Sequence, residues 1–185
     1  MKAPTSGSVI LLLAILLLAR GAGGYEIRTL ETSRADKRFS IVMTAVINLP
    51  IDEVHRRLTD FNQLTRLSPY VEESRQLEPD EAGNIIVYTR IRACVIFICK
   101  TVRIFEAITY PEKNRIVATV IPARSELAYG QSSWTLSPQG NSTLLEYESQ
   151  LEPGFDMFPL IGPAAARYSL KKQAKQFLAG LENHR

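Results

Sequence analysis

The sequence predicts an α+β domain in which a curved antiparallel sheet wraps around a long C-terminal helix, with two short helices after the first strand. Two observations lead to this fold class. Strand-like and helix-like apolar periodicities follow each other in the order strand, helical insertion, strand-rich middle and final helix. Segments rich in Pro, Gly and Asn separate the middle strands, which is typical of consecutive antiparallel hairpins.

The elements follow from local signals. Phe39–Leu49 is rich in β-branched residues and predicts the first strand, which ends at Pro50. Ile51–Phe61 has apolar residues at helical spacing and an acidic first turn, and Asn62–Leu67 predicts a second short helix. Six strands follow: Val71–Leu77, Asn84–Ala93, Lys100–Thr109, Arg115–Ile121, Leu127–Leu136 and Thr143–Leu151. The last helix begins near residues 159–163 and runs to about Glu182.

The composition is that of one globular domain. The chain has 185 residues, of which 45% are apolar, with 22 basic and 19 acidic side chains. Residues 1–24 hold two of the basic residues and none of the acidic ones, so the remainder is close to neutral. Binding to phosphate backbones needs clustered Lys and Arg. We therefore expect a monomer with a single core and no nucleic-acid partner.

The N-terminus has the organisation of an export signal. Lys2 precedes the apolar segment Ser8–Ala19, and small residues follow up to Gly24. A spanning helix needs about 20 apolar residues, so this shorter segment favours a signal peptide cleaved near Gly24 over an uncleaved anchor. We expect residues 1–24 to be the signal, 25–38 an extension that forms an edge strand or stays mobile, and 39–185 the domain. The mature protein is then secreted, with the periplasm as the expected compartment.

Export changes the interpretation of Cys94 and Cys99, because an oxidising compartment lets a disulfide persist. If Val95–Ile98 is a hairpin loop, the two cysteines lie opposite each other and can be bridged; in one continuous strand they would point to opposite faces. We expect the disulfide and no metal site, since no His or third Cys is near. The apolar tip Val95–Ile98 would contact a membrane surface transiently or pack under Phe61.

Side-chain alternation predicts a hollow inner face. On the strand Leu127–Leu136, small residues and one tryptophan share a face, which leaves room beside the final helix. The residues assigned inward are Ala128, Gly130, Ser132, Trp134 and Leu136.

A hairpin with Cys94 opposite Cys99 also places Arg90 opposite Arg103, which is unfavourable unless a carboxylate lies between them. The same register points Thr89 and Glu106 inward. Glu106 then either anchors a polar group in an apolar cavity or reaches water at the strand end.

The layout resembles the helix-grip fold of the START-like (SRPBCC) superfamily. The chain is most similar to the polyketide cyclase/dehydrase and lipid-transport group, which contains the coenzyme Q-binding proteins. The segments that carry the resemblance are PIDEVHRRLTDFNQLTRLSPYV, GQSSWTLSPQGNSTLLEY and PGFDMFPLIGPAAARYSLKKQAKQFLAGLE. They extend it over Phe39 to Leu181. Because no single motif is specific, the resemblance predicts fold more directly than activity.

The resemblance implies an apolar tunnel between sheet and helix that holds a lipid, isoprenoid quinone, sterol or polyketide. Ordinary core packing is the alternative for each residue that matches the tunnel. The matching positions are Val102, Trp134, Leu145, Tyr147, Phe155, Met157, Phe158, Leu170 and Phe177.

The sequence has few groups suited to catalysis. It has no nucleophile elbow, no Gly-rich phosphate loop and no metal-spaced cluster, and His55 and His184 stand far apart. We therefore expect a binding protein for an apolar small molecule, without a cofactor. The alternatives are a cyclase or aromatase that uses Glu106 as its acid, and a structural domain with a filled core.

Overall fold

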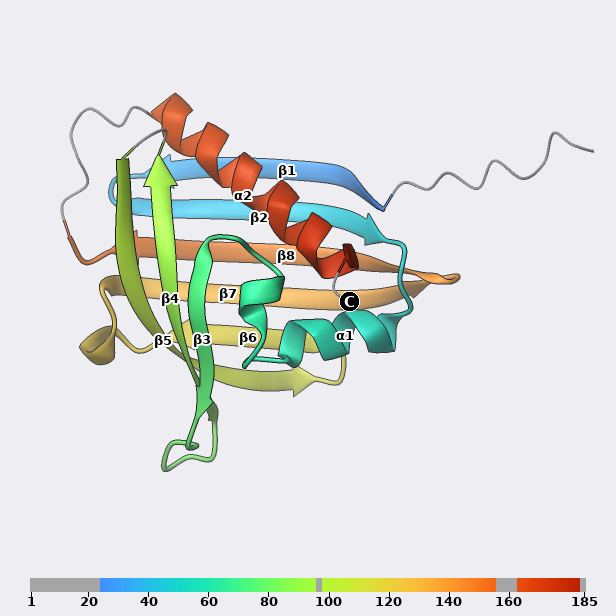
Figure 1. The fold of residues 1–185 in the computed structure, drawn as a ribbon, viewed down its shortest axis with the longest axis horizontal. Helices are drawn as coiled ribbons and strands as arrows, with labels where there is room; N and C mark the ends of the chain where they lie inside the picture. The colour runs from blue at the N-terminus through green and yellow to red at the C-terminus, as the bar shows by residue number, and fades with distance from the viewer. Residues whose placement is uncertain (1–23, 96–97, 156–162, 184–185) are drawn as a thin grey trace, which may run out of the picture.

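The computed structural model describes residues 24–95, 98–155 and 163–183, and it confirms the predicted fold class (Figure 1). An antiparallel sheet has the strand order β1-β2-β8-β7-β6-β5-β4-β3. The strands are β1 Tyr25–Ala35, β2 Arg38–Ile47, β3 Val71–Leu77, β4 Ile85–Val95, β5 Ile98–Glu112, β6 Arg115–Val120, β7 Leu127–Gln139 and β8 Ser142–Pro153. The helices are α1 Ile51–Thr59 and α2 Pro163–Asn183, with 3-10 turns η1 Leu64–Arg66 and η2 Pro122–Arg124.

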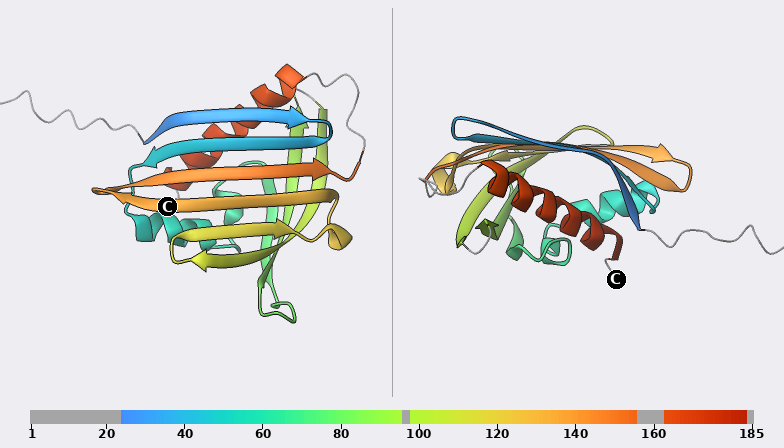
Figure 2. Two further views of the ribbon diagram at one scale, coloured as in Figure 1. Left: turned by 180° about the vertical axis from the view of Figure 1, so that it is seen from behind. Right: turned by 90° about the horizontal axis from the view of Figure 1, so that it is seen from above.

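Both helices lie on one face of the sheet, and the opposite face carries neither (Figure 2). β3 and β4 run across the direction of β1 and β2, because the sheet bends along the long strand β5 (Figure 1). β2 pairs with β8 without interruption from Phe39–Leu151 to Ile47–Thr143, which joins the two ends of the domain. The extension forms the edge strand β1, the first of the two possibilities that the sequence left open. The helices thus lie in the concave side of a bent sheet.

α1 is joined to the C-terminal end of α2 by hydrogen bonds from one buried arginine. Its first turn contains Asp52 and Glu53, and Arg57 is buried although it is charged. The Arg57 guanidinium donates to the carbonyl oxygens of Leu181 at 2.6 Å and Glu182 at 2.9 Å, and to the Glu53 carboxylate at 2.6 Å. These bonds satisfy carbonyls that the last turn of a helix leaves without partners.

The core lies between the sheet and the apolar side of α2. Leu178 and Leu181 are fully buried, while Lys171, Lys172 and Lys175 are exposed on the other side, as the helical spacing predicts. The other buried members of this core are Met43, Ala45, Ile47, Val54, Leu58, Phe61, Leu67, Val87, Ile108, Ile116, Ala118, Leu136 and Leu145.

The predicted disulfide between Cys94 and Cys99 is confirmed, and the two cysteines are paired across the β4–β5 ladder. The ladder continues to Val95 and Ile98, so the loop is shorter than the predicted four residues. The side chains of residues 95–98 lie outside the described residues, so the membrane contact of this tip stays a prediction. A disulfide is compatible with an oxidising compartment.

The register also places Arg90 opposite Arg103, as predicted, and carboxylates offset the repulsion. Arg90 forms ion pairs with Glu73 at 2.7 Å and Glu72 at 3.3 Å, and Arg103 with Glu126 at 3.4 Å. The like charges on the outer face of the hairpin therefore each have a partner of opposite sign.

Replacing Cys94 and Cys99 together with serine is expected to lower the free energy of unfolding by about 2 kcal/mol, the loop-closure term for so short a loop. Urea unfolding of the oxidised and reduced protein and of the double variant measures this. The reduced wild type serves as the control and should match the variant. Equal stability of all three would contradict a stabilising disulfide.

Candidate functional site

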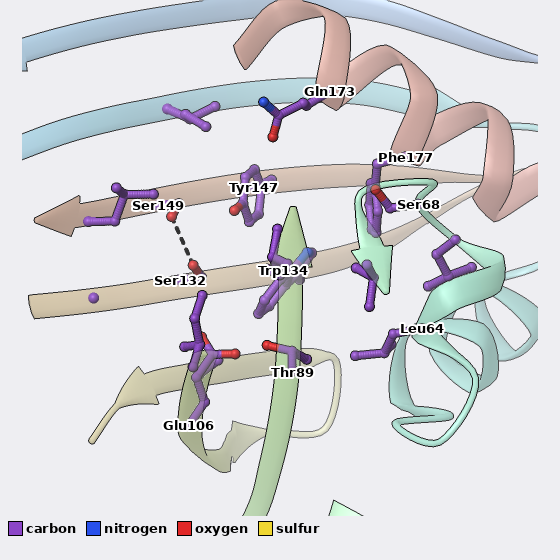
Figure 3. A pocket seen from close by; sticks show the side chains of 18 of the residues that line it. Leu64, Ser68, Thr89, Glu106, Ser132, Trp134, Tyr147, Ser149, Gln173 and Phe177 are labelled. Carbon is purple, nitrogen blue, oxygen red and sulfur yellow. Dashed lines mark hydrogen bonds between the residues drawn. The ribbon is translucent and has the colours of Figure 1, made fainter. Parts of the chain in front are cut away.

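A cavity of about 320 Å³ lies between the concave face of the sheet and the segments that cover it. Its wall is mainly apolar and comes from strands β2–β8, from α1, from the η1 segment and from α2. Figure 3 shows Trp134 and Tyr147 on the sheet side, with Leu64 and Phe177 beside them. Protein pockets that bind small ligands are typically ~300–1,000 Å³, mostly apolar and equipped with a few polar groups.

Small residues on β6 and β7 leave this space open. Ala118 on β6 is paired with Ser132 on β7, and both line the cavity together with Gly130. The next residues toward α1 are large. Trp134 on β7 is paired with Tyr147 on β8, and the centroids of their rings lie 5.2 Å apart. The hollow therefore results from the alternation of small and large side chains that the sequence showed on this strand.

The inward assignment on β7 is correct for Gly130, Ser132, Trp134 and Leu136 but wrong for Ala128. Ala128 is exposed, and Leu127, which was assigned outward, is buried and lines the cavity. The register with β8 shifts between Leu127 and Tyr129. A bulge adds one residue to the strand and inverts the alternation beyond it.

Several predicted site residues come together in the cavity wall. Trp134 and Tyr147 line it from the sheet, and Leu170 and Phe177 line it from α2. Glu106 joins them from β5 and points inward, as the hairpin register predicts.

Other predicted residues lie elsewhere. Leu145 is fully buried in the main core and does not line the cavity. Val102 belongs to a second buried cluster whose other members line the cavity, and Phe155 packs against this cluster. Phe155 carries the Lys100 ammonium 3.3 Å above its ring. Met157 and Phe158 lie outside the described residues.

Glu106 is a carboxyl without a counter-ion in the described parts of the chain. Its neighbours across the sheet are Val87 and Val120, and among the described residues its carboxyl forms no hydrogen bond or ion pair. Burial raises the pKa of Glu106 to about 7, because a desolvated carboxylate is unfavourable. Near neutral pH this group is therefore a mixture of carboxylic acid and carboxylate.

Hydroxyl groups lie on the same side of the cavity as Glu106. The Ser132 and Ser149 side-chain oxygens are 2.8 Å apart and share a hydrogen bond (Figure 3). Burial raises the pKa of Tyr147, while hydrogen bonds to Ser149 and Ser132 oppose that shift and the charge of Glu106 adds to it. We call these four residues, with Thr89, the polar wall. The Thr89 hydroxyl oxygen is buried and has no hydrogen-bond partner among the described residues.

Sequence reasoning missed the part of the wall that faces α1. Four of its members lie in the predicted helical insertion and two in the segment after it, and helical spacing shows that a side chain points inward but not whether it meets a void. They are Leu58, Phe61, Leu64, Leu67, Ser68 and Tyr70. Gln173 of α2 was also missed. Thr89 was placed inward by the hairpin register, and its lack of a partner could not be seen from sequence.

Within the part of the chain that the structure describes, no three His, Cys, Asp or Glu side chains gather as a metal site would require. In the same part, no helix is both long and apolar enough to cross a membrane.

Comparison with known proteins agrees with the fold. Residues 38–184 match the family described as polyketide cyclase / dehydrase and lipid transport. A START superfamily protein from Mycobacterium smegmatis superposes with a TM-score of 0.63 at 16% identity, covering 78% of this chain and 95% of its own. Searching the curated proteins finds no match.

Two further solved structures have the same fold. A STAR-related lipid transfer protein from Xanthomonas axonopodis has a TM-score of 0.57 at 13% identity, covering 82% of this chain and 98% of its own. The Zhui aromatase/cyclase from a Streptomyces species has a TM-score of 0.56 at 15% identity, covering 80% of this chain and 93% of its own. At these identities the likeness shows the fold alone.

Proposed function

We propose that this chain, which belongs to the polyketide cyclase / dehydrase and lipid transport family, is an exported protein that binds and carries an apolar small molecule. The ligand class is a lipid, isoprenoid quinone or polyketide-like molecule. The observation that carries the proposal is the apolar cavity of about 320 Å³ beneath α2. A mainly apolar cavity of this size with a few polar groups is typical of sites that bind small ligands.

The proposed export has two supports. Residues 1–24 have the charge and small-residue pattern of a signal peptide, and a disulfide joins Cys94 to Cys99. The STAR-related lipid transfer protein that shares this fold supports carriage of a lipid-like molecule.

The binding function predicts that the protein retains a ligand at one molecule per chain after exposure to a membrane extract. Native mass spectrometry followed by organic extraction measures this. Ala118→Phe fills the cavity and should lose the ligand, whereas Thr119→Phe adds the same ring on the exposed face of the same strand and should keep it. A bare mass for the folded wild type, or equal occupancy in both variants, would reject the carrier function.

A second candidate function rests on Glu106. A carboxyl with a pKa of about 7 in an apolar cavity can act as a general acid near neutral pH, and the Zhui aromatase/cyclase has the same fold. In that case the wild type turns over a poly-ketone substrate, and Glu106→Gln binds it without turnover. Binding without turnover by the wild type, or full turnover by Glu106→Gln, would reject this role.

A further inference from the structure

We infer that the carried molecule is uncharged and that its polar end bears a hydroxyl or carbonyl oxygen lying against the polar wall of Thr89, Glu106, Ser132, Tyr147 and Ser149. This inference rests on the proposed function and narrows it to a ligand class. The observations that carry it are the charges of the cavity wall, its hydrogen-bonding groups and their position at one side of the cavity.

The charges of the wall exclude an anionic end. Among the described residues that line the cavity, the titratable groups are Glu106, Tyr70 and Tyr147, and none is a cation. The arginines nearest to Glu106 along the hairpin, Arg90 and Arg103, lie on the outer face and pair with carboxylates there. A ligand carboxylate or phosphate would lose its hydration without gaining a counter-ion, and it would face the charge of Glu106.

The hydrogen-bonding groups of the wall fit a neutral oxygen. The Ser132–Ser149 bond uses only part of the capacity of each hydroxyl, which can donate one bond and accept others. Protonated Glu106 adds a donor. Thr89 adds a buried hydroxyl that has no partner within the part of the chain that the structure describes, and a buried polar group left unpaired is costly. A carbonyl or hydroxyl oxygen on the ligand would engage these groups.

The position of the polar wall orients the ligand. Glu106 and Thr89 come from the β4–β5 hairpin, and Ser132 and Ser149 from β7 and β8. Figure 3 shows these four on one side of the cavity, with Leu64 and Phe177 on the other. Ser68 and Gln173 are the polar side chains near that other side, and its remaining lining from η1 and α2 is mainly apolar. An amphiphile therefore places its oxygen toward the polar wall and its chain toward η1 and α2.

Three straight-chain probes of equal length separate the ligand classes: a methyl ketone, a carboxylate and a primary amine. Calorimetric titration at about pH 6 and about pH 8.5 spans the ionisation of Glu106, whose pKa is about 7. At the higher pH, wild type should bind the ketone at least about tenfold more tightly than the carboxylate, because like charges disfavour the latter. Ketone binding should weaken from the lower to the higher pH, since Glu106 stops donating.

Glu106→Gln keeps a donor and removes the charge. It should make ketone binding independent of pH and should narrow the gap between ketone and carboxylate. Glu112→Gln, an exposed position on the same strand, is the matched control and should behave as wild type. The inference is overturned if the wild type binds the carboxylate as tightly as the ketone. It is also overturned if the amine binds most tightly of the three probes and Glu106→Gln abolishes that binding. If none of the probes binds, the carrier function itself falls.

Discussion

Replacement of Gly180 with leucine is expected to lower the free energy of unfolding by more than about 4 kcal/mol, because α2 can no longer pack closely against the η1 segment. Any Cβ at Gly180 would collide with the backbone carbonyl of Leu67. A backbone group cannot rotate away as a side chain can, so the helix must shift and disturb Leu178 and Leu181, which are fully buried. Urea unfolding followed by circular dichroism measures the loss.

Gly180→Ala distinguishes this close approach from helix propensity. In an ordinary helix, glycine to alanine stabilises by about 1 kcal/mol, whereas here the alanine methyl meets the Leu67 backbone and should destabilise. Lys175→Leu, on the exposed side of the same helix, is the control and should change stability little. A more stable Gly180→Ala protein would show that α2 does not pack in this way.

The second large effect is a loss of stability with rising pH that originates from Glu106. The pKa of this carboxyl is about 7 in the folded protein against an ordinary value of 4.5. As the pH rises through the window from about 4.5 to about 7, the Glu106 carboxyl of the unfolded chain ionises, while the same carboxyl in the folded protein still holds its proton. The free energy of unfolding therefore falls, by about 3 kcal/mol in total, and this contribution is constant above the window.

Glu106→Gln should remove that dependence and be more stable than wild type at about pH 8, because the amide carries no charge to desolvate. Glu112→Gln should keep the slope of the wild type, since its carboxyl is exposed. Urea unfolding over a series of pH values gives the comparison. Parallel curves for wild type and Glu106→Gln would contradict a desolvated carboxyl at this position.

Much of the fold could be predicted because local patterns and topology agree. The positions of Cys94 and Cys99 set the β4–β5 register, which in turn placed Thr89 and Glu106 inward and Arg90 opposite Arg103. That last pair looked unfavourable in sequence because its carboxylate partners come from other segments. Such partners become visible only when the strands are assembled.

The cavity could be predicted only in part. The alternation of side chains identified the inner face along most of β7. At the start of the strand the bulge at Ala128 inverts this alternation, and no residue type in the sequence indicates the bulge. Leu145 has the same inward pattern as Tyr147 and yet lies in the packed core. The difference depends on where α1 and α2 cross the sheet, which is a property of tertiary packing.

Trp134 lies in the wall of the cavity that we propose takes up an apolar chain. Trp134 is the single tryptophan, so its fluorescence reports on this cavity alone. Titration with a brominated long-chain methyl ketone should quench it saturably at one equivalent per chain, while a water-soluble brominated quencher at the same concentration should have little effect. The absence of saturable quenching, or equal quenching by both compounds, would contradict the account.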